Sequence, residues 1–275
     1  MSLDLSPALS FAHHSDAGMV RNHNEDAVYV IPRIGVALLA DGMGGYNAGE
    51  VASGMATALI GSELERILDN GPLNPFGPNP AEAAQKVLIQ EIGRANAAIY
   101  QAAHSQPQYS GMGTTLVAAL FFDNAVTVAH VGDSRLYRFR DAQLVQLTRD
   151  HSLLQEQIDS GMISAEDAKL SHNKNLVTRA VGVDPEVEPE IHAYPTQAGD
   201  VYLLCSDGLN DMVDDAEIAL TLQTLSANLE LAATQLVQMA NDNGGRDNVS
   251  VILVRVLQAF PAPRGWLQRF LAWLK

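Results

Sequence analysis

Apolar residues recur along this chain with two different periods, which predict two kinds of secondary structure. Runs rich in valine, isoleucine, leucine and alanine that surround short turns predict pairs of strands. Three segments have this form, namely 27–41, 115–131 and 134–148. Two further runs, 201–207 and 248–256, predict single strands because each is short, apolar and rich in branched side chains.

Helices are predicted where apolar residues return every three or four positions. This spacing occurs in two long segments, 48–69 and 81–103, and in two shorter ones, 215–224 and 228–242. The long segments are joined by 70–80, which holds four prolines and is therefore expected to be a surface loop. Strands in hairpins with helices inserted in pairs predict antiparallel sheets covered by helices in one main domain, for which we set the bounds 1–258.

Two segments depart from this pattern. Residues 149–190 are polar, with short helical stretches and weak strand character, and are expected to form a flap on the main domain. The last residues, 259–275, form a tail that is amphipathic over 261–275. Such a helix is too short to span a bilayer, and it can lie on a membrane surface, bind a protein partner or pack on this protein itself.

The charge balance limits the kind of partner. The chain of 275 residues has a formal net charge of −15 and a pI near 4.8, whereas a nucleic-acid binder needs a basic patch. An anionic substrate would be repelled by the overall field, and the chain has 17 lysine and arginine residues to oppose it. Bound divalent cations would supply the missing positive charge at a phosphate site.

Cysteine usage and the N-terminus indicate a cytoplasmic protein. The single cysteine, Cys205, excludes an internal disulfide and a cysteine-rich zinc site. It lies in an apolar run, so we expect a buried strand residue and not a nucleophile. The first residues lack the basic and apolar regions of a secretory signal. We therefore expect a cytoplasmic location, with peripheral membrane contact through the tail as the one reservation.

Four aspartates stand where an apolar strand meets a turn that contains glycine: Asp41, Asp133, Asp207 and Asp247. One such aspartate is ordinary, because this residue favours turns and helix caps. Four of them, together with Glu25 and Asp26, can converge if their strands share a core. Packed carboxylates cannot all ionise without a counter-charge. Hard oxygen ligands without a cysteine or spaced histidine set select Mg²⁺ or Mn²⁺, so the pattern predicts a two-metal hydrolytic centre.

The motifs around these residues resemble the metal-dependent protein phosphatase family, the type 2C Ser/Thr phosphatases, and in particular its compact bacterial members. Seven stretches carry the resemblance in the family's order: RNHNEDA, ALLADGMGG, GMGTTLVAAL, AHVGDSRLYR, LTRDHSL, LCSDGLNDMV and GGRDNVSVILV. An ordered match of seven motifs is specific, whereas DG or GDSR alone would be weak. The resemblance implies an α+β fold, a four-layer αββα sandwich of two antiparallel sheets flanked by helix pairs.

The resemblance also implies the metal ligands. Asp41 would bridge two Mn²⁺ or Mg²⁺ ions, and Gly42 would offer its backbone carbonyl to one of them. Asp207 and Asp247 would complete the ligands of one ion. Asp133 would share a third and weaker ion with Asp207.

Four further positions receive roles from the resemblance. Glu25 and Asp26 would hold waters bound to the metals, and Asn248 would lie beside the ligands. Arg21 would grip the substrate phosphate with its fork of donors. Where eukaryotic members carry a histidine that can act as general acid, this chain has Met43, which cannot donate a proton. Bacterial relatives share this methionine, so we do not take it as a loss of activity.

The implied reaction is hydrolysis of phosphoserine and phosphothreonine in proteins by a water that the metals activate, without a covalent phosphoenzyme. Expected partners are phosphorylated proteins and a cognate Ser/Thr kinase in bacterial signalling, and we expect a monomer. Two alternatives stay open. One is an inactive relative that only binds phosphoproteins, and the other is a metal-dependent hydrolase of small phosphate esters.

Overall fold

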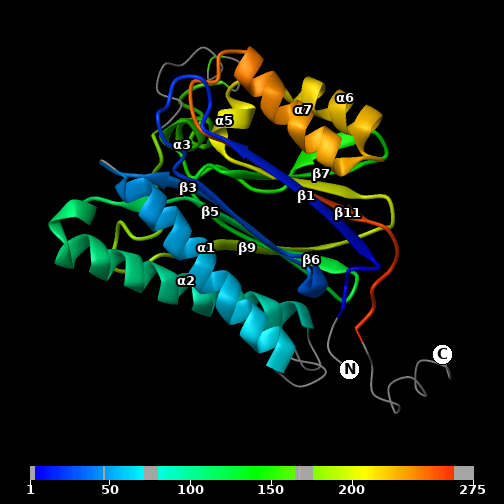
Figure 1. The fold of residues 1–275 in the computed structure, drawn as a ribbon, viewed down its shortest axis with the longest axis horizontal. Coiled ribbons are helices and arrows are strands. Elements are labelled where there is room, and N and C mark those ends of the chain that lie inside the picture. The colour runs from blue at the N-terminus through cyan, green and yellow to red at the C-terminus, as the bar shows by residue number, and fades with distance from the viewer. Residues whose placement is uncertain (1–3, 46, 71–79, 165–166, 168–175, 263–275) are drawn as a thin grey trace.

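Two antiparallel sheets pack face to face, and a pair of helices covers the outer side of each (Figure 1). The computed structural model describes residues 4–45, 47–70, 80–164, 167 and 176–262. The first sheet has the strand order β1 (Leu9–Asp16), β11 (Val249–Val256), β10 (Val201–Cys205), β7 (Arg135–Arg140) and β8 (Gln143–Gln146). The second has the order β2 (Asp26–Ile31), β3 (Val36–Met43), β5 (Leu116–Phe122), β6 (Ala125–Val131) and β9 (Glu190–Pro195), with β4 (Gly113–Thr114) beside β3.

The helices divide between the two outer faces. The long helices α1 (Ala48–Asn70) and α2 (Pro80–Ser105) cover the second sheet, and α6 (Asp215–Leu225) and α7 (Leu229–Asp242) cover the first (Figure 1). The short helix α5 (Asp207–Asn210) directly follows β10. These are the four layers that the resemblance implies, and the predicted fold class is confirmed.

Strand alternation explains why each sheet has two apolar faces. In β3, Ala37 and Leu39 point into the core between the sheets, while Leu38 and Ala40 pack under α1 and α2. β11 alternates in the same way, since its even-numbered apolar residues fill the core between the sheets and its odd-numbered ones pack under α6 and α7. A strand buried on both faces reads as a continuous apolar run, which is the pattern visible in the sequence.

Two edge strands were not predicted. β1 pairs with β11 over its full length, from Leu9 opposite Val256 to Asp16 opposite Val249, although five of its eight residues are polar. β9 pairs with β6, and its residues are half-buried or exposed. An edge strand is held by the ladder of a single neighbour and can carry polar residues on its solvent side, so its own sequence shows little strand pattern.

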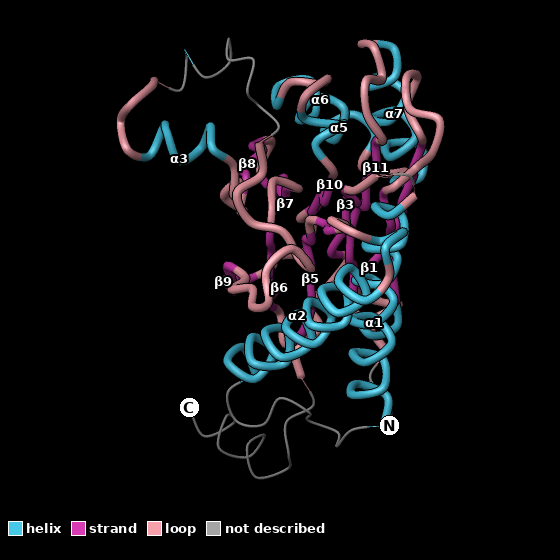
Figure 2. Tube along the Cα trace, turned by 90° about the vertical axis from the view of Figure 1, so that its left-hand side faces the viewer, coloured by secondary structure: helices cyan, strands magenta, loops and turns pink. Residues whose placement is uncertain are grey.

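The flap prediction covers a segment that the structure describes in part. The helix α3 (Leu153–Asp159) stands away from the sheets (Figure 2), and isolated bridges join Ser152 to Val177 and Thr114 to Val181. Residues 71–79 of the expected loop and 263–275 of the expected amphipathic tail lie outside the described residues. Within the described part of the chain, no helix combines the length and the apolar character that crossing a membrane requires.

Candidate active site

Strand register brings the first two carboxylates together. β2 and β3 pair with Asp26 directly opposite Asp41, so the acidic residue that opens one strand faces the one near the end of the next. Asp26 also accepts a hydrogen bond of 2.8 Å from the Ser206 hydroxyl, at the end of β10. Because β10 belongs to the other sheet, this bond lies where the two sheets converge. Asp207 directly follows Ser206 in the chain.

The shifted pKa values show that the other predicted aspartates share this place. The pKa of Asp41 lies well above its ordinary value, first because of burial and then because of the charges on Asp26, Asp207, Asp133 and Asp247. Burial and the neighbouring carboxylates raise the pKa of Asp207 in the same way. The pKa values of Asp26 and Asp133 both rise to about 6, again chiefly through burial. Five carboxylates separated by up to 221 positions in the chain therefore form one cluster.

The cluster suits divalent cations. Among the described residues, Asp26 and Asp207 each keep one buried carboxylate oxygen, Oδ1, without a hydrogen-bond partner. A buried unpaired acceptor is costly in an apo protein, and a bound cation satisfies it. The donors here are carboxylate and carbonyl oxygens, which Mg²⁺ and Mn²⁺ prefer. The residues present therefore fit the metals that the sequence predicts.

Two glycines allow the backbone segments of this cluster to approach closely. A Cβ on Gly42 would stand 2.1 Å from the carbonyl oxygen of Gly49, and one on Gly208 would stand 2.0 Å from that of Asn248. No other residue fits such contacts without movement of the backbone. Each glycine directly follows a predicted ligand, so the DG pair recurs in the sequence for a steric reason.

Arg21 lies at the open side of the cluster. Its side chain is 53% exposed, and its Nη2 donates to Asp247 Oδ2 at 2.7 Å. Glu25 lies nearby, partly buried beside Gly49, and burial raises its pKa while Arg21 opposes that rise. A guanidinium in this position can bind an anion that enters the cluster from solvent.

Asn248 is a structural tie between chain segments that are more than 220 positions apart. Its side chain donates to the carbonyls of Ala17 and His23 and accepts from the Glu25 N–H at 2.8 Å. Its own N–H donates to Asp247 Oδ1. The residue thus holds the loop that carries Arg21 and Glu25 against the segment that carries Asp247. His23 contributes its carbonyl, while the residue is exposed.

Hydroxyl side chains support the cluster, and sequence reasoning gave them no role. Thr115 Oγ1 accepts from the Asp41 N–H at 3.0 Å and bonds to Ser134 Oγ at 2.7 Å. Thr114 Oγ1 donates to the Asp41 carbonyl at 2.8 Å, and Ser206 Oγ accepts from the Ser250 N–H. These residues lie inside the GTT, GDSR and CSDG motifs, so their presence in the motifs was the available signal.

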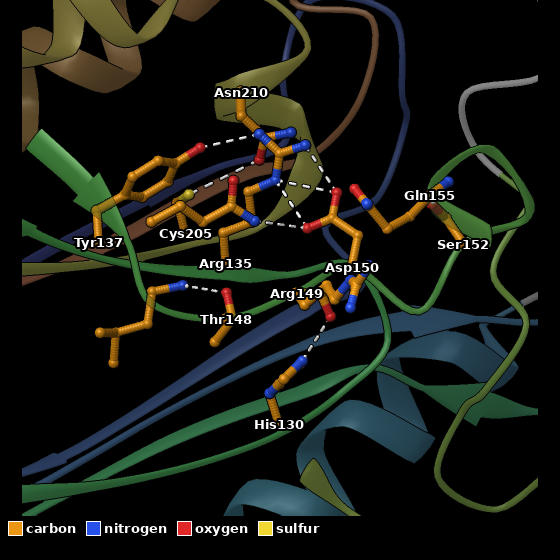
Figure 3. A network of polar contacts seen from close by, with 12 residues as sticks. His130, Arg135, Tyr137, Thr148, Arg149, Asp150, Ser152, Gln155, Cys205 and Asn210 are labelled. Atoms are coloured by element: carbon orange, nitrogen blue, oxygen red, sulfur yellow. Dashed lines mark hydrogen bonds and ion pairs between the residues drawn. The ribbon is translucent and has the colours of Figure 1, made fainter. Parts of the chain in front are cut away.

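A second group of possible ligands joins His130 of β6 to His151 and Glu190 at the two ends of the flap segment, with ligand atoms within 4.8 Å of one another. Hydrogen bonds already account for both rings. His130 Nε2 bonds to the Arg149 carbonyl at 2.7 Å (Figure 3), and His151 Nδ1 accepts the Gly132 N–H at 3.2 Å. His151 Nε2 lies 3.7 Å from Glu190 Oε2 and 3.5 Å from Arg179 Nη1. Burial lowers the pKa of His151 to about 4, so this buried ring is neutral at pH 7 and ties Gly132, next to Asp133, to the base of the flap.

Comparison with known proteins agrees with this geometry. Residues 13–249 match the family described as Protein phosphatase 2C. The chain is 40% identical over 243 residues to the serine/threonine phosphatase stp of Listeria welshimeri, covering 87% of this chain and 93% of that protein. It is also 40% identical over 249 residues to the serine/threonine protein phosphatase PstP of Mycobacterium tuberculosis, and spans 45% of that longer protein.

Solved structures give the same result. The catalytic domain of the serine threonine protein phosphatase PstP, in complex with two manganese ions, superposes with a TM-score of 0.78 at 39% identity. That alignment covers 91% of this chain and 99% of the solved one. The S. agalactiae serine/threonine phosphatase superposes with a TM-score of 0.81 at 32% identity, covering 90% and 99% of the two chains.

Proposed function

This chain belongs to the protein phosphatase 2C family, and on that premise we propose that the carboxylate cluster around Asp41 is where it hydrolyses phosphoserine and phosphothreonine in proteins. The enzyme depends on Mn²⁺ or Mg²⁺. The composition of the cluster supports this assignment. Five carboxylates meet where the two sheets converge, two of their oxygens are buried without partners among the described residues, and an exposed arginine stands beside them.

We assign the ligands from the family match and the positions described above. Asp41, whose pKa the charges of the other four carboxylates raise, would hold metal ions together with the Gly42 carbonyl. Asp207, Asp247 and Asp133 would supply the further carboxylate ligands. When bound, such ions acidify water and neutralise the charge on phosphate oxygens.

The remaining residues position the ligands and the substrate. Ser206 holds Asp26 through its hydroxyl, and the Thr114 and Thr115 side chains hold the backbone of Asp41. Asn248 fixes the relative positions of Glu25 and Asp247. Arg21 is free to exchange its exposed contact with Asp247 for phosphate oxygens, because Asp247 would then be occupied by a cation.

A Mn²⁺-dependent assay tests this function. A phosphothreonine peptide and a small phosphate ester are compared at equal concentration, with EDTA and the variant Asp207→Asn as blanks. We expect Mn²⁺-dependent release of phosphate with higher kcat/KM for the peptide. Equal or better turnover of the small ester would favour the alternative hydrolase, and binding without turnover would indicate an inactive phosphoprotein binder.

We also propose that the enzyme opposes a Ser/Thr protein kinase in bacterial signalling, because the relatives it matches are named Ser/Thr phosphatases. Deleting the gene should raise phosphorylation at a set of serine and threonine sites, and deleting the kinase as well should abolish that rise. Sites that persist in the double deletion would contradict the pairing.

Our proposals for location and assembly are that the protein acts as a cytoplasmic monomer, with residues 261–275 available for contact with a membrane surface or a protein. Light scattering measures the oligomeric state. Fractionation of the full chain and of one that ends at residue 260 tests the tail. Equal membrane partitioning of the two would contradict the proposed membrane contact.

A further inference from the structure

A cleft of about 790 Å³ opens beside the candidate centre. One wall is the flap helix α3 with Leu154, Gln155 and Ile158, and the other runs from α5 into the first turn of α6. Asp133 and Asp207 line its inner end, so the cleft is continuous with the carboxylate cluster. We call this space the flap cleft.

The lining of the flap cleft is strongly acidic. Beyond Asp133 and Asp207 it holds five more carboxylates: Asp150, Asp211, Asp214, Asp215 and Glu217. Among the described residues that line it, Arg135 supplies the positive charge. Its guanidinium donates to both oxygens of Asp150, at 2.7 Å from Nη2, and to the Tyr137 hydroxyl at 2.9 Å (Figure 3). The charges of Arg135 and Asp150 cancel one another, so the negative field in the cleft comes from the remaining carboxylates.

Three of these carboxylates serve the start of helix α6, and they stay negatively charged in that role. Asp214 and Glu217 form a capping box at the start of α6, in which each side chain accepts a backbone N–H of the other residue. Asp215 also stands in this first turn, where a carboxylate favours the helix dipole. All three side chains are nevertheless exposed toward the cleft, and a capped carboxylate keeps its negative charge.

The other surfaces of the flap cleft are apolar. Leu154 and Ile158 face it from the flap, and Met212 and Val213 from the opposite side. A lysine or arginine side chain matches such a mixed surface, because its methylene stem packs on apolar groups while its charged head reaches carboxylates.

We propose that the flap cleft binds the polypeptide beside the phosphorylated residue and selects substrates with arginine or lysine close to the phosphoserine or phosphothreonine. This inference rests on the proposed phosphatase function, since the substrate enters at the adjoining cluster. Basic neighbours also offset the repulsion between a phosphopeptide and a chain of net charge −15, which speeds encounter.

The test compares three phosphothreonine peptides that differ only in the flanking residues, which are arginine, alanine or glutamate. Wild-type enzyme in Mn²⁺ should show the highest kcat/KM for the arginine peptide, mainly through a lower KM. The double variant Asp215→Asn with Glu217→Gln should reduce this preference by roughly two- to fivefold for each charge removed, while turnover of the alanine peptide is unchanged. Glutamine at the second position preserves the capping box, so the helix is retained.

Glu230→Gln is the matched control, because Glu230 is also an exposed acid in the first turn of a helix, α7, and does not line the flap cleft. It should leave the preference intact. Equal kcat/KM for the three peptides on wild-type enzyme, or a preference that the double variant keeps, overturns the proposal for the cleft. Absence of Mn²⁺-dependent turnover with every peptide would instead overturn the proposed function, so the two failures are distinguishable.

Discussion

Replacing Asp133 by asparagine should stabilise the metal-free protein at neutral pH. Asp133 is 7% exposed, and burial is the largest cause that raises its pKa from 3.8 to about 6. A raised pKa means that the folded protein binds this proton more tightly than the unfolded chain does. The stability that this proton contributes is present below about pH 4 and is lost as the pH rises through about 6.

The size of the effect follows from the shift. About two pKa units correspond to about 3 kcal/mol of unfolding free energy lost at pH 7.5, and to about 1 kcal/mol at pH 4.5, where the carboxyl is still largely protonated when folded. Asparagine imitates the protonated acid and removes the ionisation. In EDTA, Asp133→Asn should therefore stabilise the protein by about 2 kcal/mol more at pH 7.5 than at pH 4.5.

Urea unfolding followed by circular dichroism measures this difference, with Asp242→Asn, an exposed aspartate on α7, as control. Saturating Mn²⁺ should reduce or reverse the stability advantage of Asp133→Asn over the wild type. Metal binding stabilises the wild type by about 2.7 kcal/mol at one hundred times Kd, and the variant lacks one ligand. If Asp133→Asn changes the free energy of unfolding equally at both pH values in EDTA, ionisation of Asp133 does not destabilise the folded protein. The argument that Asp133 needs a bound cation would then be wrong.

Three further predictions concern single residues. Asp207→Asn should lower Mn²⁺-dependent turnover by roughly 10²-fold or more with an unchanged circular dichroism spectrum, and near-normal activity would remove Asp207 from the site. Arg21→Lys keeps the charge but loses the planar fork, so KM for every phosphopeptide should rise about tenfold, and an unchanged KM would mean that Arg21 does not touch phosphate. Burial raises the pKa of the Cys205 thiol to about 12, so Ellman's reagent at pH 8 should label it in urea but not in the native protein, and rapid native labelling would contradict its burial.

The sequence predicted the elements that carry local information. The central strands β3, β5, β10 and β11 are buried on both faces, so each is a continuous apolar run, and helices α1, α2, α6 and α7 show their period directly. The edge strands β1 and β9 lack such a pattern because pairing with a buried neighbour holds them. The edge strands β2 and β8 were predicted because a short turn joins each to its apolar partner, whereas β1 and β9 pair with strands far away in the chain.

For the candidate site, the sequence indicated the acidic residues but not their supports. An aspartate at a strand end is visible in one dimension, and the ordered motifs linked the strand ends into one family pattern. The bonds of Asn248 to Ala17, His23 and Glu25 cross 223 to 231 positions, and no local pattern encodes them. His151 acts in the same way, since its contact with Gly132 exists only after the flap base has packed. Such contacts depend on the complete fold.

Ionic strength separates the two electrostatic features of this enzyme. The five aspartates of the carboxylate cluster are half-buried or buried, so dissolved salt screens them less than Asp214, Asp215 and Glu217, which are exposed. Charges on these exposed residues are screened over about 8 Å at 0.15 M salt. Raising the salt concentration should therefore erase the advantage of an arginine-flanked peptide while Mn²⁺-dependent turnover of the alanine peptide persists. If added salt lowers both the advantage of the arginine peptide and the turnover of the alanine peptide, the same charges retain the metals and select the peptide. The separation of the metal centre from an exposed cleft that selects substrates would then be wrong.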